Sequence, residues 1–335
     1  MIRAMITKED AMREITFSEA LGEAMLEEME RDPTIFTYGE DIAKQGGIFG
    51  AYKSILGKYQ DKIIDTPISE EVIFGSALGA ALAGMRPVAE FHFADFLFTG
   101  MTAIANQIMK FKYMTGGQGK LHLILRGPDG ISKSAAAQHS ESIETLFMHI
   151  PGIKIIVPST PYDMKGLFKT ALKADDPVIC FEHKMLYAKK GPVPEEEYYI
   201  PFGKADVKKE GKDVTVVTTS RMVHESLKAS EELAHDGIDV EVVDLRTLVP
   251  WDKETVLESV KKTHHLVVAH ETWRRAGWGA EIAATVQEEA FDYLDGPITR
   301  VGAKNVHIPF SSTLQDFVVP DYKSVISAVR KVLNV

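Results

Sequence analysis

The sequence predicts an α/β protein with a largely parallel sheet and two domains. The chain has 335 residues, which exceeds the size at which single hydrophobic cores usually divide. Short β-rich apolar runs alternate with helical patterns along its length. Strands separated by ten or more helical residues require parallel crossover connections, and a sheet built this way is covered by helices on both faces.

In the first half of the chain, apolar runs and helical patterns alternate from residue 62 onward. Strands are expected at 62–66, 87–93, 121–126, 153–157 and 177–182. Helices are expected at 72–85, 95–113, 142–149 and 161–174. The helix at 72–85 carries many small residues, which favour close approach of another helix.

A charged, proline-containing segment at 189–197 then interrupts the alternation, as is typical of linkers. The second half resumes it, with strands expected at 213–219, 238–244, 264–270 and 298–301 and helices at 222–235, 252–262, 281–293 and 322–333. We therefore predict a leader at 1–13, a first domain at 14–190, a linker at 191–208 and a second domain at 209–335.

The composition is that of an ordinary soluble globular protein. Hydrophobic residues make up 45% of the chain and charged residues 26%. No apolar run reaches the roughly 18 residues of a membrane span, and the N-terminus lacks the long apolar core of a secretory signal. We expect a cytoplasmic protein without a membrane partner.

The net charge and the single cysteine indicate which partners and which compartment the protein has. The chain has 38 basic and 48 acidic residues, a net charge of −10, which argues against nucleic-acid binding and permits a basic protein partner. Its one cysteine, Cys180, lies in an apolar strand pattern. Small core filler in a reducing compartment is therefore favoured for Cys180 over a nucleophile.

Several familiar motifs are missing from the sequence. No Gly-x-Gly-x-x-Gly follows a strand, and there is no Walker loop, Gly-x-Ser-x-Gly, His-Glu-x-x-His or Cys-x-x-Cys. There is also no Gly-Asp-Gly with a downstream Asn that would hold a magnesium-bound pyrophosphate.

Glu70 is the first candidate for chemistry. It ends the segment Asp-Thr-Pro-Ile-Ser-Glu and directly precedes the run of small and apolar residues. If this carboxylate is buried, desolvation raises its pKa, so that it can share a proton with a ring nitrogen. The alternative is that Ser69 or Glu70 caps the helix and favours its dipole.

Two further segments leave predicted strands, where parallel sheets bind ligands. Phe96 lies in an aromatic run at 91–98 and could stack on a planar heterocycle or pack in the core. His139 lies in a Gly/Ser/Ala-rich loop at 126–140. It could act as acid, base or oxyanion partner, or cap the helix that follows.

Taken together, these stretches resemble the β subunit of the thiamine-diphosphate-dependent E1 component of 2-oxo acid dehydrogenase complexes, a family that includes pyruvate, branched-chain and acetoin dehydrogenases. The resemblance extends over nearly the whole chain from about Met12. It is carried by Tyr-Gly-Glu-Asp at 38–41, Asp-Thr-Pro-Ile-Ser-Glu at 65–70, Phe-Ala-Asp-Phe at 93–96, Tyr-Met-Thr-Gly-Gly at 113–117, Gln-His-Ser at 138–140, His-Ile-Pro-Gly-Ile-Lys at 149–154, Pro-Ser-Thr-Pro-Tyr-Asp at 158–163 and Asp-Leu-Arg-Thr-Leu at 244–248.

The resemblance implies an N-terminal thiamine-diphosphate pyrimidine-binding domain and a C-terminal transketolase-like α/β domain. It implies that Glu70 bonds N1′ of the cofactor's aminopyrimidine and that Phe96 and Ile68 line this ring. His139 matches the family's active-site histidine, which stabilises anionic intermediates and helps acyl transfer to a lipoyl thiol. His92 either lines the acyl pocket or has a packed or exposed role.

The resemblance also implies a structural potassium ion bound through main-chain oxygens. By position these belong to Leu123, Ala171, Leu172, Ala174 and Asp176. Ala174 departs from the acidic residue that is often found there.

The missing pyrophosphate motif then implies a partner. An E1 α subunit would hold the diphosphate and Mg²⁺ in an α₂β₂ heterotetramer, and the C-terminal domain would join the β subunits and dock the E2 lipoyl acyltransferase. The small-molecule substrate would be a 2-oxo acid or acetoin. The alternatives are a subunit of a split transketolase-like thiamine enzyme and a non-catalytic subunit that tethers E1 α to E2.

Overall fold

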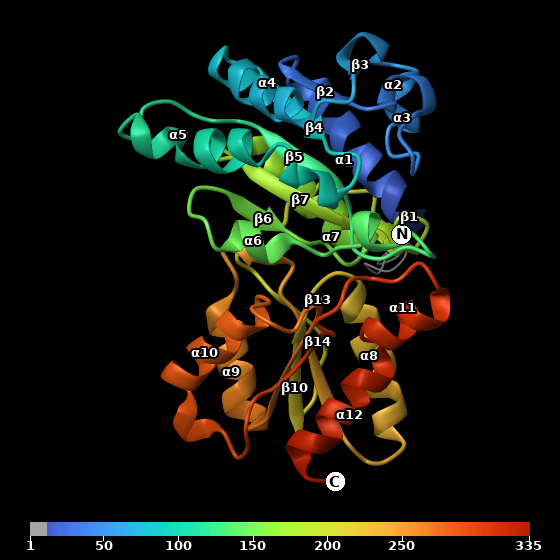
Figure 1. The fold of residues 1–335 in the computed structure, drawn as a ribbon, viewed down its shortest axis with the longest axis vertical. Helices are drawn as coiled ribbons and strands as arrows, with labels where there is room; N and C mark the ends of the chain where they lie inside the picture. Colours follow the sequence, from blue (N-terminus) through green and yellow to red (C-terminus); the bar gives the residue numbers. More distant parts are fainter. Residues whose placement is uncertain (1–11) are drawn as a thin grey trace, which may run out of the picture.

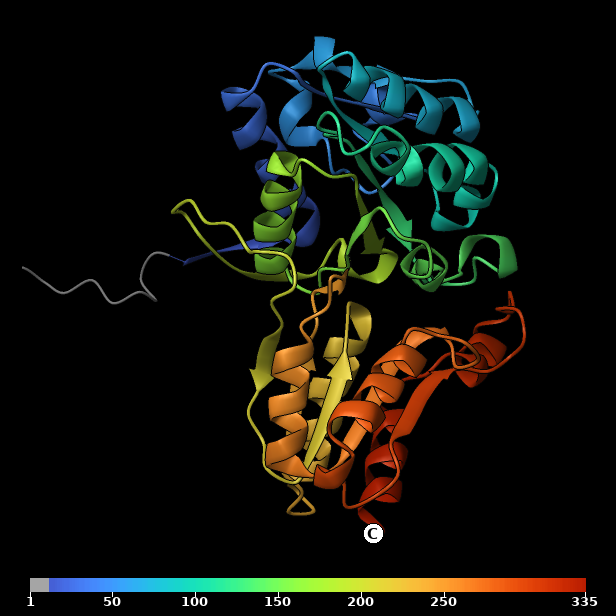
Figure 2. The ribbon, with the colours of Figure 1, turned by 90° about the vertical axis from the view of Figure 1, so that its left-hand side faces the viewer.

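The computed structural model describes residues 12–335, so the expected leader lies outside the described residues except for positions 12 and 13. Two α/β domains lie one above the other, and the C-terminus lies at the far end of the second domain (Figures 1 and 2). The predicted fold class is confirmed.

The first domain contains a seven-stranded sheet with the order β12-β6-β7-β5-β4-β2-β3. Its pairings are parallel except for β12, which runs antiparallel to β6 and comes from the second half of the chain. The strands are β2 (Ile35–Gly39), β3 (Ile63–Asp65), β4 (Arg86–Glu90), β5 (Ile124–Asp129), β6 (Lys154–Ile156), β7 (Val178–His183) and β12 (Thr247–Val249).

Helices cover both faces of this sheet, as expected for parallel strands buried on both sides. Alternation along the strands explains the two cores: Ile179 and Phe181 face one apolar cluster, whereas Val178 and Cys180 face the other. Cys180 is fully buried and unpaired. The helices are α1 (Phe17–Arg31), α2 (Ile42–Gln45), α3 (Lys53–Leu56), α4 (Glu70–Leu82), α5 (Met109–Met114), α6 (Glu144–Met148) and α7 (Pro161–Lys173).

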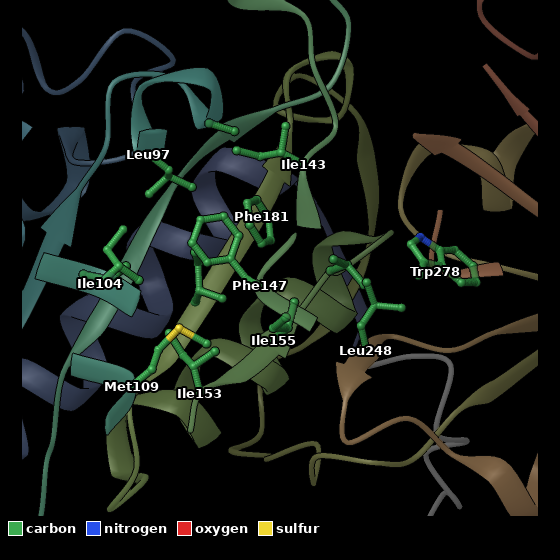
Figure 3. Close-up of a cluster of buried hydrophobic side chains, with 14 of the residues drawn as sticks. Leu97, Ile104, Met109, Ile143, Phe147, Ile153, Ile155, Phe181, Leu248 and Trp278 are labelled. Carbon is green, nitrogen blue, oxygen red and sulfur yellow. The ribbon is translucent and has the colours of Figure 1, made fainter. Parts of the chain in front are cut away.

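One of the two cores continues from the first domain into the second. Figure 3 shows Phe147 and Phe181 at its centre, with ring centroids 5.9 Å apart, and Leu248 and Trp278 on the side of the second domain. The two domains therefore share buried apolar surface.

The second domain contains a five-stranded sheet with the order β14-β13-β10-β11-β9, parallel except for β9. Its strands are β9 (Asp206–Lys209), β10 (Val214–Thr218), β11 (Val240–Asp244), β13 (Leu266–Trp273) and β14 (Thr299–Ala303). Its helices are α8 (Arg221–Ala234), α9 (Lys253–Thr263), α10 (Gly279–Glu289), α11 (Ser312–Val318) and α12 (Tyr322–Leu333). Figure 1 shows α9 and α10 on one side of the sheet and α8 and α12 on the other.

The structure contains several elements that were not expected from the sequence: those before residue 62, among them α1 and β2, and also β12 and α11. Two expected segments differ as well. The helix expected at 95–113 is divided into a 3₁₀ turn (Ala94–Phe98), a π-helix (Thr102–Ile108) and α5. The expected linker contains strand at both ends, since β8 (Lys190–Pro194) pairs antiparallel with β1 (Met12–Thr16) and β9 joins the second sheet. Lysine and proline are common on such edge strands. Because the same residues are typical of linkers, the sequence pattern did not distinguish these strands from a linker.

Buried polar contacts join the carboxyl ends of the strands in the two domains. Glu271 Oε1 in β13 accepts a hydrogen bond from the main-chain N–H of Ile131 at 2.8 Å and lies 2.9 Å from His183 Nε2. Burial alone would raise the pKa of Glu271, but His183 and Arg221 lower it well below its usual value. The strand ends of the two sheets therefore face one another.

Candidate functional site

The candidate site lies in a groove where these strand ends meet. The groove has a volume of about 490 Å³. Its lining residues are Asp95, Phe96, Phe98, Ala137, Gln138, His139, Glu141 and His307. All except His307 come from the first domain, so the second domain closes one side of the groove.

The polar residues around the groove follow the ends of neighbouring parallel strands. Glu40 directly follows β2, Glu70 follows β3, His92 follows β4, His139 follows β5 and Lys184 follows β7. The carboxyl ends of parallel strands lie at one edge of the sheet, where α/β proteins bind ligands. The topology therefore collects residues that are far apart in the sequence.

His139 packs against two aromatic rings at this edge. Its ring lies 4.9 Å from Phe93 and 5.3 Å from Phe96, nearly perpendicular to both. It belongs to a 3₁₀ turn (Ala137–His139), and the following helix α6 has Ile143 as its N-cap. His139 therefore does not cap that helix, and the structure brings together the two predicted site residues His139 and Phe96.

Buried charged residues hold the loop that carries His139. The Lys184 ammonium donates to the main-chain oxygen of His139 at 2.6 Å and lies 5.2 Å from the centre of the Phe93 ring. Asp95 Oδ1 accepts from the main-chain N–H of Glu141 at 3.3 Å. Burial lowers the pKa of Lys184 and raises that of Asp95. The loop is thus fixed on both sides of His139.

Glu70 is the first residue of α4, and Ser69, the N-cap, makes no side-chain capping bond. Burial raises the pKa of Glu40, and the negative charge of Glu70 raises it further. His92 Nδ1 lies 3.9 Å from Glu40 Oε2. Burial lowers the pKa of His92. The charge of His139 lowers this pKa further, whereas the charge of Glu70 raises it. A continuous electrostatic group therefore connects Glu70 with the His139 groove.

Glu70 is only half-buried in this chain, and Ile68 is 80% exposed. The burial of Glu70 that was considered from the sequence is therefore only partial in this structure. Glu70 begins α4, and Ile68 lies two residues before it.

Sequence reasoning did not assign roles to Glu40, Asp95 or Lys184. Glu40 and Asp95 lie in the segments 38–41 and 93–96, which were recognised only as similar to the family. Lys184 directly follows the buried strand β7, and this position at a strand end is the signal that could have identified it.

The expected potassium ligands come from the residue before β5 and from the last turn of α7 and the loop after it. They are Leu123, Ala171, Leu172, Ala174 and Asp176. The Leu172 oxygen accepts from Arg86 Nη1 at 2.8 Å, and the Ala174 oxygen lies 2.7 Å from His122 Nδ1. A carbonyl oxygen has two lone pairs, so each of these oxygens retains one for a cation. The potassium ion and its ligands stay a prediction.

Comparison with protein families agrees with this geometry. Residues 13–190 match the transketolase pyrimidine binding domain, and residues 203–325 match the transketolase C-terminal domain. The fold and the site therefore define a chain of the transketolase-like, thiamine-diphosphate-dependent class. Within residues 12–335, no helix is long and apolar enough to span a membrane.

Similar proteins of known description specify the family. The chain is 44% identical over 332 residues to the β subunit of acetoin:2,6-dichlorophenolindophenol oxidoreductase from Cupriavidus necator. The alignment covers 96% of this chain and 98% of that protein. The chain is 45% identical over 320 residues to the pyruvate dehydrogenase E1 β subunit of Rickettsia felis, with coverage of 95% and 98%. The chain belongs to the family of E1 β subunits of 2-oxo acid and acetoin dehydrogenases.

Two more relatives show the breadth of the likeness. The 2-oxoisovalerate dehydrogenase β subunit of Bacillus subtilis is 39% identical over 323 residues, with coverage of 96% and 99%. A solved structure described as a split-gene transketolase in an inactive β₄ tetramer is 27% identical, with a TM-score of 0.78 and coverage of 96% and 98%.

Proposed function

We propose that the chain is the β subunit of a cytoplasmic E1 enzyme that decarboxylates a 2-oxo acid or cleaves acetoin and then reductively acylates the lipoyl group of E2. The observation that carries the proposal is the electrostatic group formed by Glu70, Glu40, His92 and His139 at the strand ends. Thiamine diphosphate, when bound, supplies the carbon nucleophile for this chemistry.

The residues of this chain then have distinct tasks. Glu70 holds a proton at N1′ of the aminopyrimidine, while Phe96 and Ile68 pack against that ring. Glu40 is buried next to this group, and burial and the charge of Glu70 raise the pKa of Glu40. His139 donates to developing negative charge in the groove and assists acyl transfer.

The outer surface of α4 supports a shared site. Ile68, Val72 and Leu82 are 80%, 64% and 50% exposed, although they are large and apolar. A Cβ atom added at Gly75 or Gly79 would meet no atom within 4 Å, so this helix surface has room for close approach of a partner. Exposed apolar surface of this kind marks a protein interface.

We propose that the E1 α subunit covers this surface in an α₂β₂ heterotetramer. That subunit would hold the diphosphate and Mg²⁺, because this chain lacks the corresponding motif and residues 12–335 contain no cluster of three or more metal-ligating side chains. The C-terminal domain would join the β subunits and dock E2.

Replacing Glu70 tests its role directly. Glu70→Gln in the reconstituted heterotetramer should retain assembly and abolish hydrogen exchange at C2 of bound cofactor. Glu71→Gln is the matched control, because Glu71 is the exposed neighbour in the same helix turn. Exchange at the wild-type rate in Glu70→Gln would contradict the role, and it would favour the alternative of a subunit that only tethers E1 α to E2.

Because the structure is similar to that of a split-gene transketolase, transketolase activity is a second candidate function. Turnover of the reconstituted pair with pyruvate, branched-chain 2-oxo acids, acetoin and ketose phosphates separates the two. Ketose phosphate turnover without lipoyl acylation would select the transketolase.

Potassium is proposed as a structural ion for the main-chain oxygens beside β5. Thermal unfolding in KCl should occur at a higher temperature than in NaCl of equal ionic strength, because an ion that binds only the folded state stabilises it. Equal unfolding temperatures in the two salts would remove the ion from the proposal.

A further inference from the structure

A second cavity lies at the carboxyl ends of two neighbouring parallel strands in the C-terminal domain. β13 ends at Trp273 and β14 ends at Ala303, and a cavity of about 430 Å³ opens beside both ends. Open parallel sheets bind ligands at this edge. The cavity shares no lining residue with the groove that contains His139. It is therefore a candidate site outside the proposed catalytic groove.

Four basic side chains surround this cavity. Arg274 and Arg275 follow β13, Arg300 lies within β14 and Lys304 follows β14. None of the four forms an ion pair within residues 12–335, whereas Arg330 of the same domain pairs with Asp236 at 2.6 Å. The chain as a whole has a net charge of −10. The unpaired cations are therefore a local feature of this edge.

Main-chain contacts hold the cavity wall in place. Arg300 Nη1 donates to the main-chain oxygen of Arg274 at 3.2 Å, and the main-chain N–H of Arg274 donates to the Ala303 oxygen at 3.0 Å. Gly302 permits this close approach, because a Cβ atom there would lie 2.7 Å from His270 and 2.9 Å from the Arg274 Cα. The side-chain amide of Asn305 also faces Arg275, and its oxygen would accept from Arg275 Nη2 at 3.0 Å if the amide oxygen and nitrogen were exchanged.

We propose that this basic cavity binds a small anion that carries phosphate groups. A guanidinium presents its N–H groups in a planar fork that matches phosphate oxygens, and several such forks converge here. The cavity has the size of a small-molecule site, whereas protein docking uses about 800 Å² of surface on each partner. A compact polyanion therefore fits the geometry better than an acidic protein surface. This site goes beyond the proposed catalytic function and does not depend on it.

The direct test is calorimetric titration of the heterotetramer with inorganic pyrophosphate. Saturating thiamine diphosphate is present throughout, because the cofactor site itself accepts a diphosphate. Wild type should bind the probe, and Arg300→Ala should weaken binding about tenfold or more, since a charge-assisted hydrogen-bond pair is lost. Arg330→Ala removes the same charge from the same domain and should leave binding unchanged.

A second variant guards against loss of folding. Arg274 is exposed, so Arg274→Ala should fold normally and also weaken binding about tenfold. Absence of pyrophosphate binding by the wild-type protein would overturn the proposal, as would equal binding by wild type, Arg274→Ala and Arg300→Ala. Binding of poly-glutamate without binding of pyrophosphate would overturn the ligand class. These outcomes are measured without turnover, so they are independent of the result for Glu70.

Discussion

Replacing Lys184 by methionine tests how the structure positions His139. The ammonium of Lys184 is buried and donates to the His139 main-chain oxygen at 2.6 Å. Methionine retains similar bulk but removes the donor and the charge. The carbonyl then loses a partner, and the loop that carries His139 gains freedom on the side nearest the groove.

The size of the effect follows from the type of contact. A hydrogen bond from a charged donor contributes about 1.5–3 kcal/mol, and one pKa unit or one decade in rate corresponds to about 1.4 kcal/mol. If this contact holds the reactive geometry, kcat falls about 10- to 150-fold. Affinity for the cofactor stays unchanged, because Lys184 does not belong to the surface around Glu70 and Ile68.

Steady-state kinetics of the reconstituted heterotetramer, together with cofactor titration, measure both quantities. Lys184→Arg retains the positive charge and should recover part of kcat. Lys120→Met is the matched control, since Lys120 is 66% exposed and pairs with Asp175 at the surface. A folded Lys184→Met enzyme with wild-type kcat would refute the reasoning.

Three further outcomes are expected. Arg126→Met should lower the free energy of unfolding by about 3–5 kcal/mol in urea titration, because it leaves two buried carboxylates uncompensated. Gly79→Leu should weaken association with the α subunit in sedimentation experiments, whereas Gly57→Leu, also in open space, should not. Burial raises the pKa of Glu144 to about 7, so the folded state retains a proton that the unfolded state loses near pH 4.5. Stability should therefore fall between about pH 4.5 and 7, and Glu144→Gln should reduce this fall in pH-dependent urea titrations.

Most of the fold follows from the alternation of apolar and helical patterns. Most strands in the centre of each sheet are buried on both faces and are continuous apolar runs, so they could be predicted from the sequence. The interior strand β2 was not predicted; its segment Ile-Phe-Thr-Tyr-Gly is short and contains polar and glycine residues. The edge strands β1, β8 and β9 are short and polar, and the sequence signal for them is weak. Strand β12 comes from the second half of the chain but pairs with β6 in the sheet of the first domain. A long-range pairing of this kind cannot be predicted from a local sequence pattern.

The site could be predicted in part, for a related reason. Glu70 and His139 stand out because each follows a distinctive local segment. Their relation to Glu40, Asp95 and Lys184 depends on which strands are neighbours, and that order is not present in any local stretch of sequence. The partial exposure of Glu70 was not predicted either, because no local pattern shows which side of α4 remains uncovered.

The buried ion network beneath the site explains why its residues can hold their positions. Arg126 in β5 is bonded to Glu90 in β4 and to Glu182 in β7, with 2.6 Å between Arg126 Nε and Glu182 Oε1. Two to three residues further along the same strands, the chain reaches His92, Asp129 and Lys184. A guanidinium with fixed planar geometry ties three adjacent strands together, so their carboxyl ends cannot shift independently. Arg126→Met should therefore reduce kcat in protein that remains folded. If this variant loses stability but keeps full activity, the ion network does not position the residues of the site.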